Sequence, residues 1–142
     1  MSPGRMNEMT EPEAVLTANQ AFYGAFADGD VEAMDAVWSR REPVTCTHPG
    51  WAVLTGRQAV MDSWRTILDS PGRPRITCRM AEAYLLDGAA YVTCYEDVGQ
   101  GTLAATNIFV QEDGMWRMTH HQAGPTAAPG IGAADAPVGV VH

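Results

Sequence analysis

Residues 107–123 read NIFVQEDGMWRMTHHQA, with Asp113-Gly114 between two apolar, β-branched segments. An Asp-Gly pair flanked by such segments predicts a β-hairpin with a two-residue loop. A loop of this length also fixes which residues lie opposite one another. The predicted pairs are Gln111 with Trp116, Phe109 with Met118, and Asn107 with His120.

Two further turn signals precede this hairpin, at Asp87-Gly88 and at Gly99-Gln100. From Arg75 onward they separate four strand-like segments, which predicts an antiparallel meander of four strands. The same two-residue logic extends the register across the meander. It pairs Ala105 with Cys94, Leu103 with Glu96, Ala81 with Cys94, and Arg79 with Glu96.

The half of the chain before the meander has a helical period. Thr10-Glu11-Pro12-Glu13 fits a capping box, and apolar residues then recur at three- and four-residue steps as far as Asp28-Gly29. Two more helices are expected over 31–39 and 56–70, with a short strand over 44–47 between them. Helices followed by a run of strands indicate an α+β domain with the helices on one face of a curved sheet.

Composition narrows the classes of function. A chain of 142 residues is long enough for one domain, and a net charge of −8 without a basic run argues against nucleic acid as a partner. No signal-peptide pattern or run of eighteen apolar residues occurs, so we expect a cytoplasmic protein with no membrane association. The three cysteines, Cys46, Cys78 and Cys94, lack the paired spacing of zinc sites, and we expect buried thiols and no metal.

Three segments carry a resemblance to a known family: FADGDVEAM (26–34), VTCTHPGWAVLTGRQAVMDSW (44–64) and the hairpin NIFVQEDGMWRMTHHQA. Over 11–123 the chain resembles the SnoaL-like branch of the nuclear transport factor 2-like superfamily, which includes ketosteroid isomerase-like and polyketide cyclase-like proteins. The resemblance implies a cone-shaped half-barrel with three N-terminal helices on the concave face of a mainly antiparallel sheet, a pocket between them, and often a homodimer. Residues 1–10 and the Ala/Gly/Pro-rich 124–142 are expected to be flexible.

The predicted register places a few polar residues on the apolar, inward face of the sheet. These pocket candidates are Arg79, Glu96, Asn107 and His120. His120 is favoured over His121, since neighbours on a regular strand point to opposite faces, whereas a bulge near the strand end would reverse the choice.

Each candidate has a functional and a structural interpretation. His48 can act as an acid or base at the pocket rim, or its ring can cap the His48-Pro49-Gly50 turn. Glu96 can be a general base if burial raises its pKa, or it can form an ion pair with Arg79. His120 with Asn107 can orient a carbonyl group or form a satisfied core pair.

Two tryptophans complete the predicted pocket. Trp51 and Trp64 can form its aromatic wall, although the helical stripe alone explains Trp64 as core. We therefore expect a binder of a hydrophobic or aromatic small molecule, with His48, His120 and Glu96 as candidate catalytic residues and Trp51, Trp64, Asn107 and Arg79 as ligand contacts. No cofactor is implied.

The reaction class stays open, because a fold does not specify a reaction. One reading is a cofactor-free isomerisation, cyclisation or dehydration by proton transfer. The alternative is a non-catalytic dimeric binding or interaction module with a filled pocket, and pocket volume separates the two. Apolar residues on the outer sheet face predict a homodimer contact: Tyr84, Tyr91, Tyr95, Ile108 and Val110.

Overall fold

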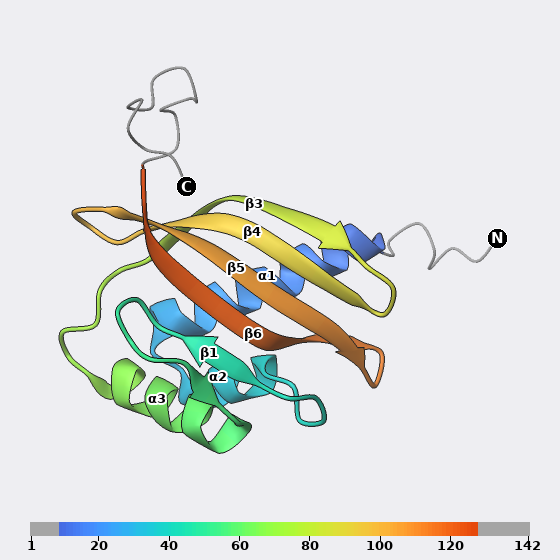
Figure 1. Ribbon diagram of the computed structural model, residues 1–142, viewed down its shortest axis with the longest axis horizontal. Helices are drawn as coiled ribbons and strands as arrows, with labels where there is room; N and C mark the ends of the chain where they lie inside the picture. The colour runs from blue at the N-terminus through green and yellow to red at the C-terminus, as the bar shows by residue number, and fades with distance from the viewer. Residues whose placement is uncertain (1–8, 128–142) are drawn as a thin grey trace.

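The computed structural model describes residues 9–127 and shows three helices and six strands (Figure 1). In chain order these are α1 (Glu11–Asp28), α2 (Val31–Val37), β1 (Thr45–Thr47), β2 (Leu54–Thr55), α3 (Arg57–Asp69), β3 (Thr77–Leu85), β4 (Ala89–Asp97), β5 (Thr102–Glu112) and β6 (Met115–Thr126). Within this part of the chain, no helix has the length and apolar character needed to span a membrane.

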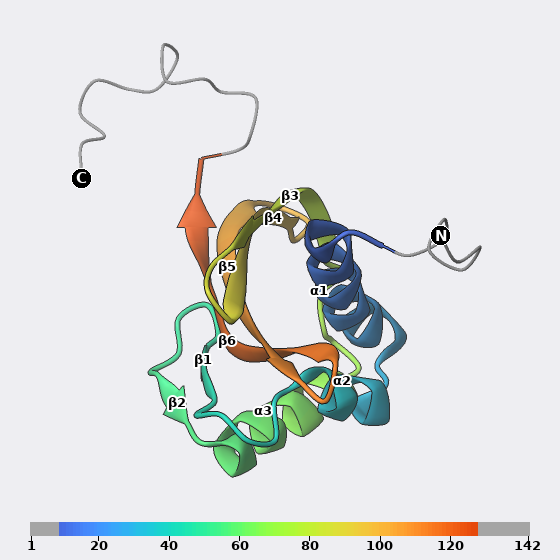
Figure 2. The same cartoon turned by 90° about the vertical axis from the view of Figure 1, so that its right-hand side faces the viewer.

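The strands form one sheet in the order β2-β1-β6-β5-β4-β3, in which only the β1–β6 pair is parallel. The sheet curves, α1 lies across the concave side of β3 to β5, and α2 and α3 lie below it near β6 and β1 (Figure 2). The predicted α+β half-barrel is thus confirmed. Strand β2 was not predicted, because a two-residue strand leaves no periodic signal.

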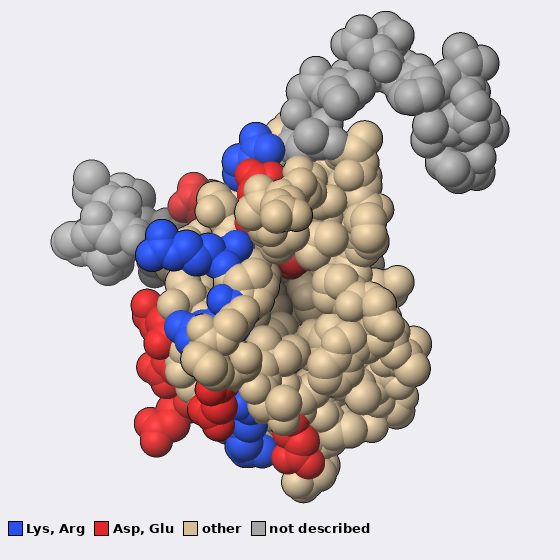
Figure 3. Space-filling view, turned by 90° about the vertical axis from the view of Figure 1, so that its left-hand side faces the viewer, with Lys and Arg blue, Asp and Glu red and all other residues tan. Residues whose placement is uncertain are grey.

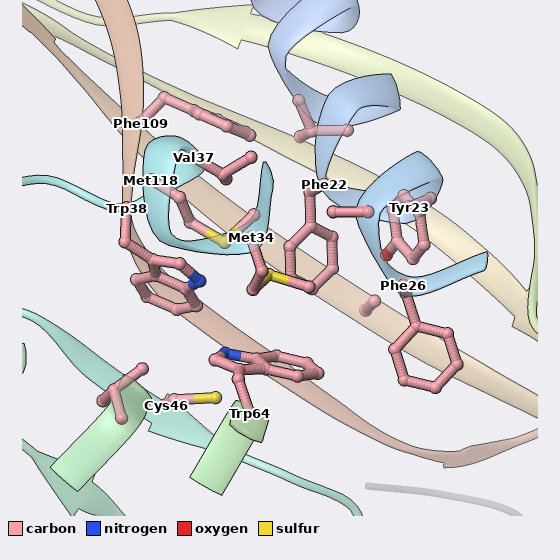
Figure 4. Close-up of a cluster of buried hydrophobic side chains, with 14 of the residues drawn as sticks. Phe22, Tyr23, Phe26, Met34, Val37, Trp38, Cys46, Trp64, Phe109 and Met118 are labelled. Carbon is pink, nitrogen blue, oxygen red and sulfur yellow. The ribbon is translucent and has the colours of Figure 1, made fainter. Parts of the chain in front are cut away.

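Helix α1 begins and ends where the sequence indicates. The Thr10 hydroxyl accepts a hydrogen bond from the Glu13 amide at 3.3 Å, and Gly29 ends the helix in the left-handed conformation with φ 64°. The apolar stripe of α1 faces the sheet and α3. Phe22 and Phe26 point toward Trp64 of α3, with ring centroids 5.4 and 6.1 Å away (Figure 4).

The β5–β6 hairpin is regular at its loop and irregular beyond it. Asp113 and Gly114 both have positive φ, 56° and 78°, as the predicted loop requires, and the two pairs nearest the loop are confirmed. The prediction that Asn107 faces His120 is wrong. Thr119 is an extra residue between two pairs, Phe109–Met118 and Ile108–His120, so Asn107 faces His121.

A second bulge interrupts the β3–β4 pair. The register shifts between Arg79 and Glu82, where Met80 has a φ of 56°. Cys78, instead of Arg79, therefore lies opposite Glu96. The predicted Arg79–Glu96 ion pair is wrong, because one inserted residue turns the Arg79 side chain to the other face of the sheet.

Strand β6 continues past the predicted domain boundary at residue 123. Residues 123–126 pair with 102–105 of β5, so this small-residue segment is part of the ladder. The remainder of the predicted tail, 128–142, and most of the predicted flexible N-terminus, 1–8, lie outside the described residues.

Candidate functional site

A cavity of about 400 Å³ opens between α1, α3 and the end of the sheet where β4 and β5 meet. Figure 3 looks onto this end of the molecule and shows the hollow among uncharged side chains. Its walls are mostly apolar, and its polar groups are few. The lining residues are Phe22, Tyr23, Phe26, His48, Pro49, Trp51, Trp64, Ile67, Pro74, Ile76, Glu96, Val98, Leu103 and His121.

Glu96 of β4 is the carboxyl group of this cavity. Its side chain is buried, and its Oε2 accepts a hydrogen bond of 2.6 Å from the hydroxyl of Tyr23 on α1. Burial raises the pKa of Glu96, and the bond from Tyr23 partly opposes that rise. Burial, and then the neighbouring Glu96, raise the pKa of Tyr23, so its hydroxyl stays protonated as a donor.

The buried amide of Asn107 on β5 determines the tautomer of His121. Its nitrogen donates to Asn19 Oδ1 at 2.8 Å and to the Tyr23 hydroxyl at 3.2 Å. Its oxygen can only accept, so His121 Nδ1, 2.6 Å away, must carry the proton. The Nε2 atom of the neutral ring is then an acceptor, and it lies 4.0 Å from Glu96 Oε2.

His121 stays neutral because of where it lies. Burial, followed by the charges of His48 and His120, lowers its pKa to about 3. Its ring packs 4.8 Å from Phe22 and 6.1 Å from Trp64. Near neutral pH this histidine can therefore accept a proton or a hydrogen bond at Nε2, but it carries no charge of its own.

His48 forms a second polar pair in the cavity wall. Ser63 Oγ of α3 donates to the Val60 carbonyl at 2.6 Å, so the 2.8 Å bond with His48 Nε2 requires the histidine to donate. The Nδ1 atom of His48 is then the acceptor. Burial lowers the pKa of His48 to about 4.

Comparison with known proteins assigns the chain to a family. Residues 15–128 match the family model of the SnoaL-like domain. The chain belongs to this family. The solved structures it resembles place this SnoaL-like domain in the nuclear transport factor 2-like superfamily.

Three similar proteins illustrate the range of the matches. A candidate dehydratase of the NTF2-like family from Streptomyces avermitilis is 29% identical, with a TM-score of 0.75 and coverage of 83% of this chain and 97% of that one. A candidate calcium/calmodulin-dependent protein kinase type II association domain from Thiobacillus denitrificans is 31% identical, with a TM-score of 0.68. The match covers 84% of this chain and 99% of that one.

The third is the F-box protein SKIP8 of Arabidopsis thaliana, which is 26% identical over 112 residues. The match covers 78% of the SnoaL-like chain and 48% of that relative, so the chain spans about half the length of the relative.

The cavity brings together four of the predicted site residues of this SnoaL-like protein. Glu96, His48 and Trp64 are buried in its wall, and Trp51 lies at the mouth, 45% exposed, with its ring 4.8 Å from that of His48. The backbone also turns here, since the Trp51 amide donates to the His48 carbonyl at 2.9 Å. Both interpretations of His48, as a cavity group and as part of a turn, describe its position.

The other three predicted residues lie elsewhere. Asn107 is buried behind the lining and acts on it through Tyr23 and His121. The prediction that His120 lies on the same face of the sheet as Asn107 is wrong. The bulge turns the His120 ring away, and its Nδ1 forms a hydrogen bond of 2.7 Å with the Thr45 hydroxyl. Arg79 is half-exposed and forms an ion pair with Asp97.

Sequence reasoning missed several groups that complete the site. Tyr23 and Asn19 come from α1, and Ser63 comes from α3. Asn19 and Tyr23 are four residues apart on the apolar face of one helix, and this spacing is the signal that could have identified them. Within residues 9–127, no three His, Cys, Asp or Glu side chains gather in a way that could hold a metal ion.

Proposed function

We propose that this SnoaL-like protein binds a hydrophobic or aromatic small molecule in its cavity and catalyses a cofactor-free isomerisation, cyclisation or dehydration by proton transfer. The observation that supports this most is the position of Glu96. Its carboxyl group lines an otherwise apolar cavity, held by Tyr23 at 2.6 Å and facing His121 Nε2 at 4.0 Å. A carboxyl group with a raised pKa in such surroundings suits general acid–base work near neutral pH.

The residues divide the proton transfer among them. In its ionised form Glu96 takes a proton from an acidic C–H or O–H of the ligand and returns it at a second ligand atom, so no net proton is consumed. The Tyr23 hydroxyl holds the carboxylate during the transfer. The 4.0 Å between Glu96 Oε2 and His121 Nε2 is too long for a direct hydrogen bond, so Nε2 can accept a hydrogen bond from a ligand hydroxyl in the cavity.

The rest of the cavity suits an uncharged ring system. Trp51, Trp64, Phe22 and Phe26 line it, and a volume of about 400 Å³ falls in the range of small-molecule sites. His48 offers Nδ1 as a second acceptor that orients the ligand. His120 has no role in this proposal, because its ring is engaged with Thr45. The similarity to a candidate dehydratase is consistent with proton-transfer chemistry.

The test uses β-tetralone, a compact aromatic ketone with acidic C–H groups. The protein should accelerate exchange of those hydrogens for deuterium, followed by NMR in D₂O. Glu96→Gln keeps the size of the side chain and removes the base, so exchange should slow by roughly a hundredfold or more. The matched control is Glu32→Gln, an exposed carboxyl on α2 outside the cavity. Equal rates for wild type and Glu96→Gln would refute the proposed base.

A second candidate is assembly. The similarity at 31% identity to a candidate kinase association domain favours it, and so does a run of exposed apolar residues on β3 and its following turn. These are Met80, Tyr84 and Leu86, and Tyr84 lies on the outer face of the sheet, stacked on Tyr91 at 4.9 Å between centroids. We propose a homodimer through this outer sheet face, which leaves the cavity on the concave side free for ligand.

A further inference from the structure

A groove lies beside the cavity. The volume of this groove is about 470 Å³. Three residues line both the groove and the cavity: Phe26 of α1, and Pro74 and Ile76 of the connection between α3 and β3. The two spaces therefore adjoin at these three side chains. Unlike the cavity, the groove has two arginines in its wall, Arg73 and Arg75.

These two arginines differ from the other cations described in residues 9–127. Each of the others forms an ion pair with an aspartate or glutamate: Arg40, Arg41, Arg57, Arg65, Arg79 and Arg117. Arg73 and Arg75 have no carboxylate of the described residues within ion-pair distance. The charges of Arg73 and Arg75 are therefore not neutralised by a direct ion pair within the described residues. Figure 3 shows arginine side chains, with acidic side chains among them, to one side of the hollow.

Arg73 is held in place by backbone groups. Its Nε donates to the Phe26 carbonyl at 3.3 Å, and its two terminal nitrogens donate to the carbonyls of Leu68 at 3.4 Å and Ala27 at 3.2 Å. Three of its five N–H groups are engaged in this way, which leaves two for another acceptor. Arg75, two residues on, is exposed and adds a second guanidinium to the same groove.

We infer that the ligand of this protein is a carboxylic acid with an apolar body, whose carboxylate binds at Arg73 and Arg75 while its body enters the cavity. This inference rests on the proposed ligand-binding function and names its ligand class. A carboxylate deep in the cavity would meet Glu96, and no arginine lines that space. The adjoining groove supplies the opposite charge, and guanidinium groups match a carboxylate in geometry.

The test compares lauric acid with lauryl alcohol, which have the same apolar chain and differ in charge. Each displaces the uncharged fluorescent probe N-phenylnaphthylamine from the protein at neutral pH. Wild type should bind the acid more tightly than the alcohol. Arg75→Gln should weaken binding of the acid by about three- to fivefold, as expected for a partly exposed charge pair, and leave the alcohol unchanged. The matched control is Arg65→Gln, an exposed arginine of α3 outside the groove.

The outcomes separate this inference from the proposed function. Alcohol binding without preference for the acid, or an equal effect of Arg75→Gln on both compounds, overturns the inference and leaves the cavity as a binding site. Failure of the probe, the acid and the alcohol to bind overturns both. Added salt should weaken the binding of lauric acid and leave the binding of lauryl alcohol unchanged. An affinity for the acid that does not change in high salt also counts against the carboxylate contact.

Discussion

At the scale of single residues, the hydrogen bonds of the buried Asn107 amide determine which nitrogen of His121 carries the proton. Asn107 has one oxygen and two N–H groups, and all of them are used, on His121, Asn19 and Tyr23. That full set of bonds assigns one tautomer to His121 and one donor role to Tyr23. Replacing the amide would leave buried polar atoms without partners, at a cost of about 1–3 kcal/mol each.

His48 predicts a pH dependence of stability. Its folded pKa, about 4, lies below the ordinary value of 6.5, so the unfolded chain binds the proton more readily and stability is lost as pH falls from about 6.5 toward 4. His48→Asn should remove this contribution. The measurement is the free energy of unfolding in urea at about pH 6 and about pH 5. It should fall between these values in both proteins, and the fall in His48→Asn should be smaller than in wild type by up to about 1.4 kcal/mol per pH unit.

Ser63→Ala is the control for this measurement. It removes the hydrogen-bond partner of His48 and keeps the titrating ring. The variant should lose stability at every pH while retaining the wild-type slope. A His48→Asn variant with the slope of wild type would show that His48 is not the group responsible.

At the scale of elements, α1 contains two glycines with opposite roles. Gly24 lies within the helix, and an added Cβ there would meet no atom within 4 Å. Gly29 ends the helix at a φ of 64°, and an added Cβ would lie 2.8 Å from Arg73 Nη2. The left-handed backbone favours glycine at this position, and an added Cβ would also displace the Arg73 guanidinium.

The same substitution should therefore have opposite effects at the two sites. Gly24→Ala should raise the free energy of unfolding by about 0.5–1 kcal/mol, because alanine restricts the unfolded chain and favours helix. Gly29→Ala should lower it by about 1 kcal/mol or more. Chemical denaturation of both variants measures the difference, and an equal effect of the two would contradict this account of the helix end.

The strands show where reasoning from sequence succeeded and where it failed. Turn residues carry their own signal, so the loop at Asp113-Gly114 and the pairs beside it were predicted. The bulges at Thr119 and at Met80 follow no local pattern. Thr119 donates its hydroxyl to the Pro43 carbonyl, and the Met118 carbonyl accepts from the Ser39 amide, both on segments far away in sequence.

At the scale of the whole molecule, the proposed dimer is directly testable. Tyr91→Glu introduces a charge beside Tyr84 on the outer sheet face, and it should convert the proposed dimer to a monomer because a buried unpaired carboxylate opposes association. Light scattering coupled to size-exclusion chromatography reports the mass. The matched control is Val53→Glu, an exposed residue between β1 and β2, which should leave the mass unchanged. A monomeric wild type would contradict the proposal.

The sequence by itself determined the helices, the four-strand meander, the α+β class and the carboxyl group of the pocket, because periodicity, caps and turn residues are local properties of the chain. It could not determine which histidine faces the cavity or that Tyr23 holds Glu96. Those depend on a one-residue insertion in β6 and on how α1 lies against β4. Only the tertiary structure decided them, since a shift of one residue reverses the face of every side chain beyond it.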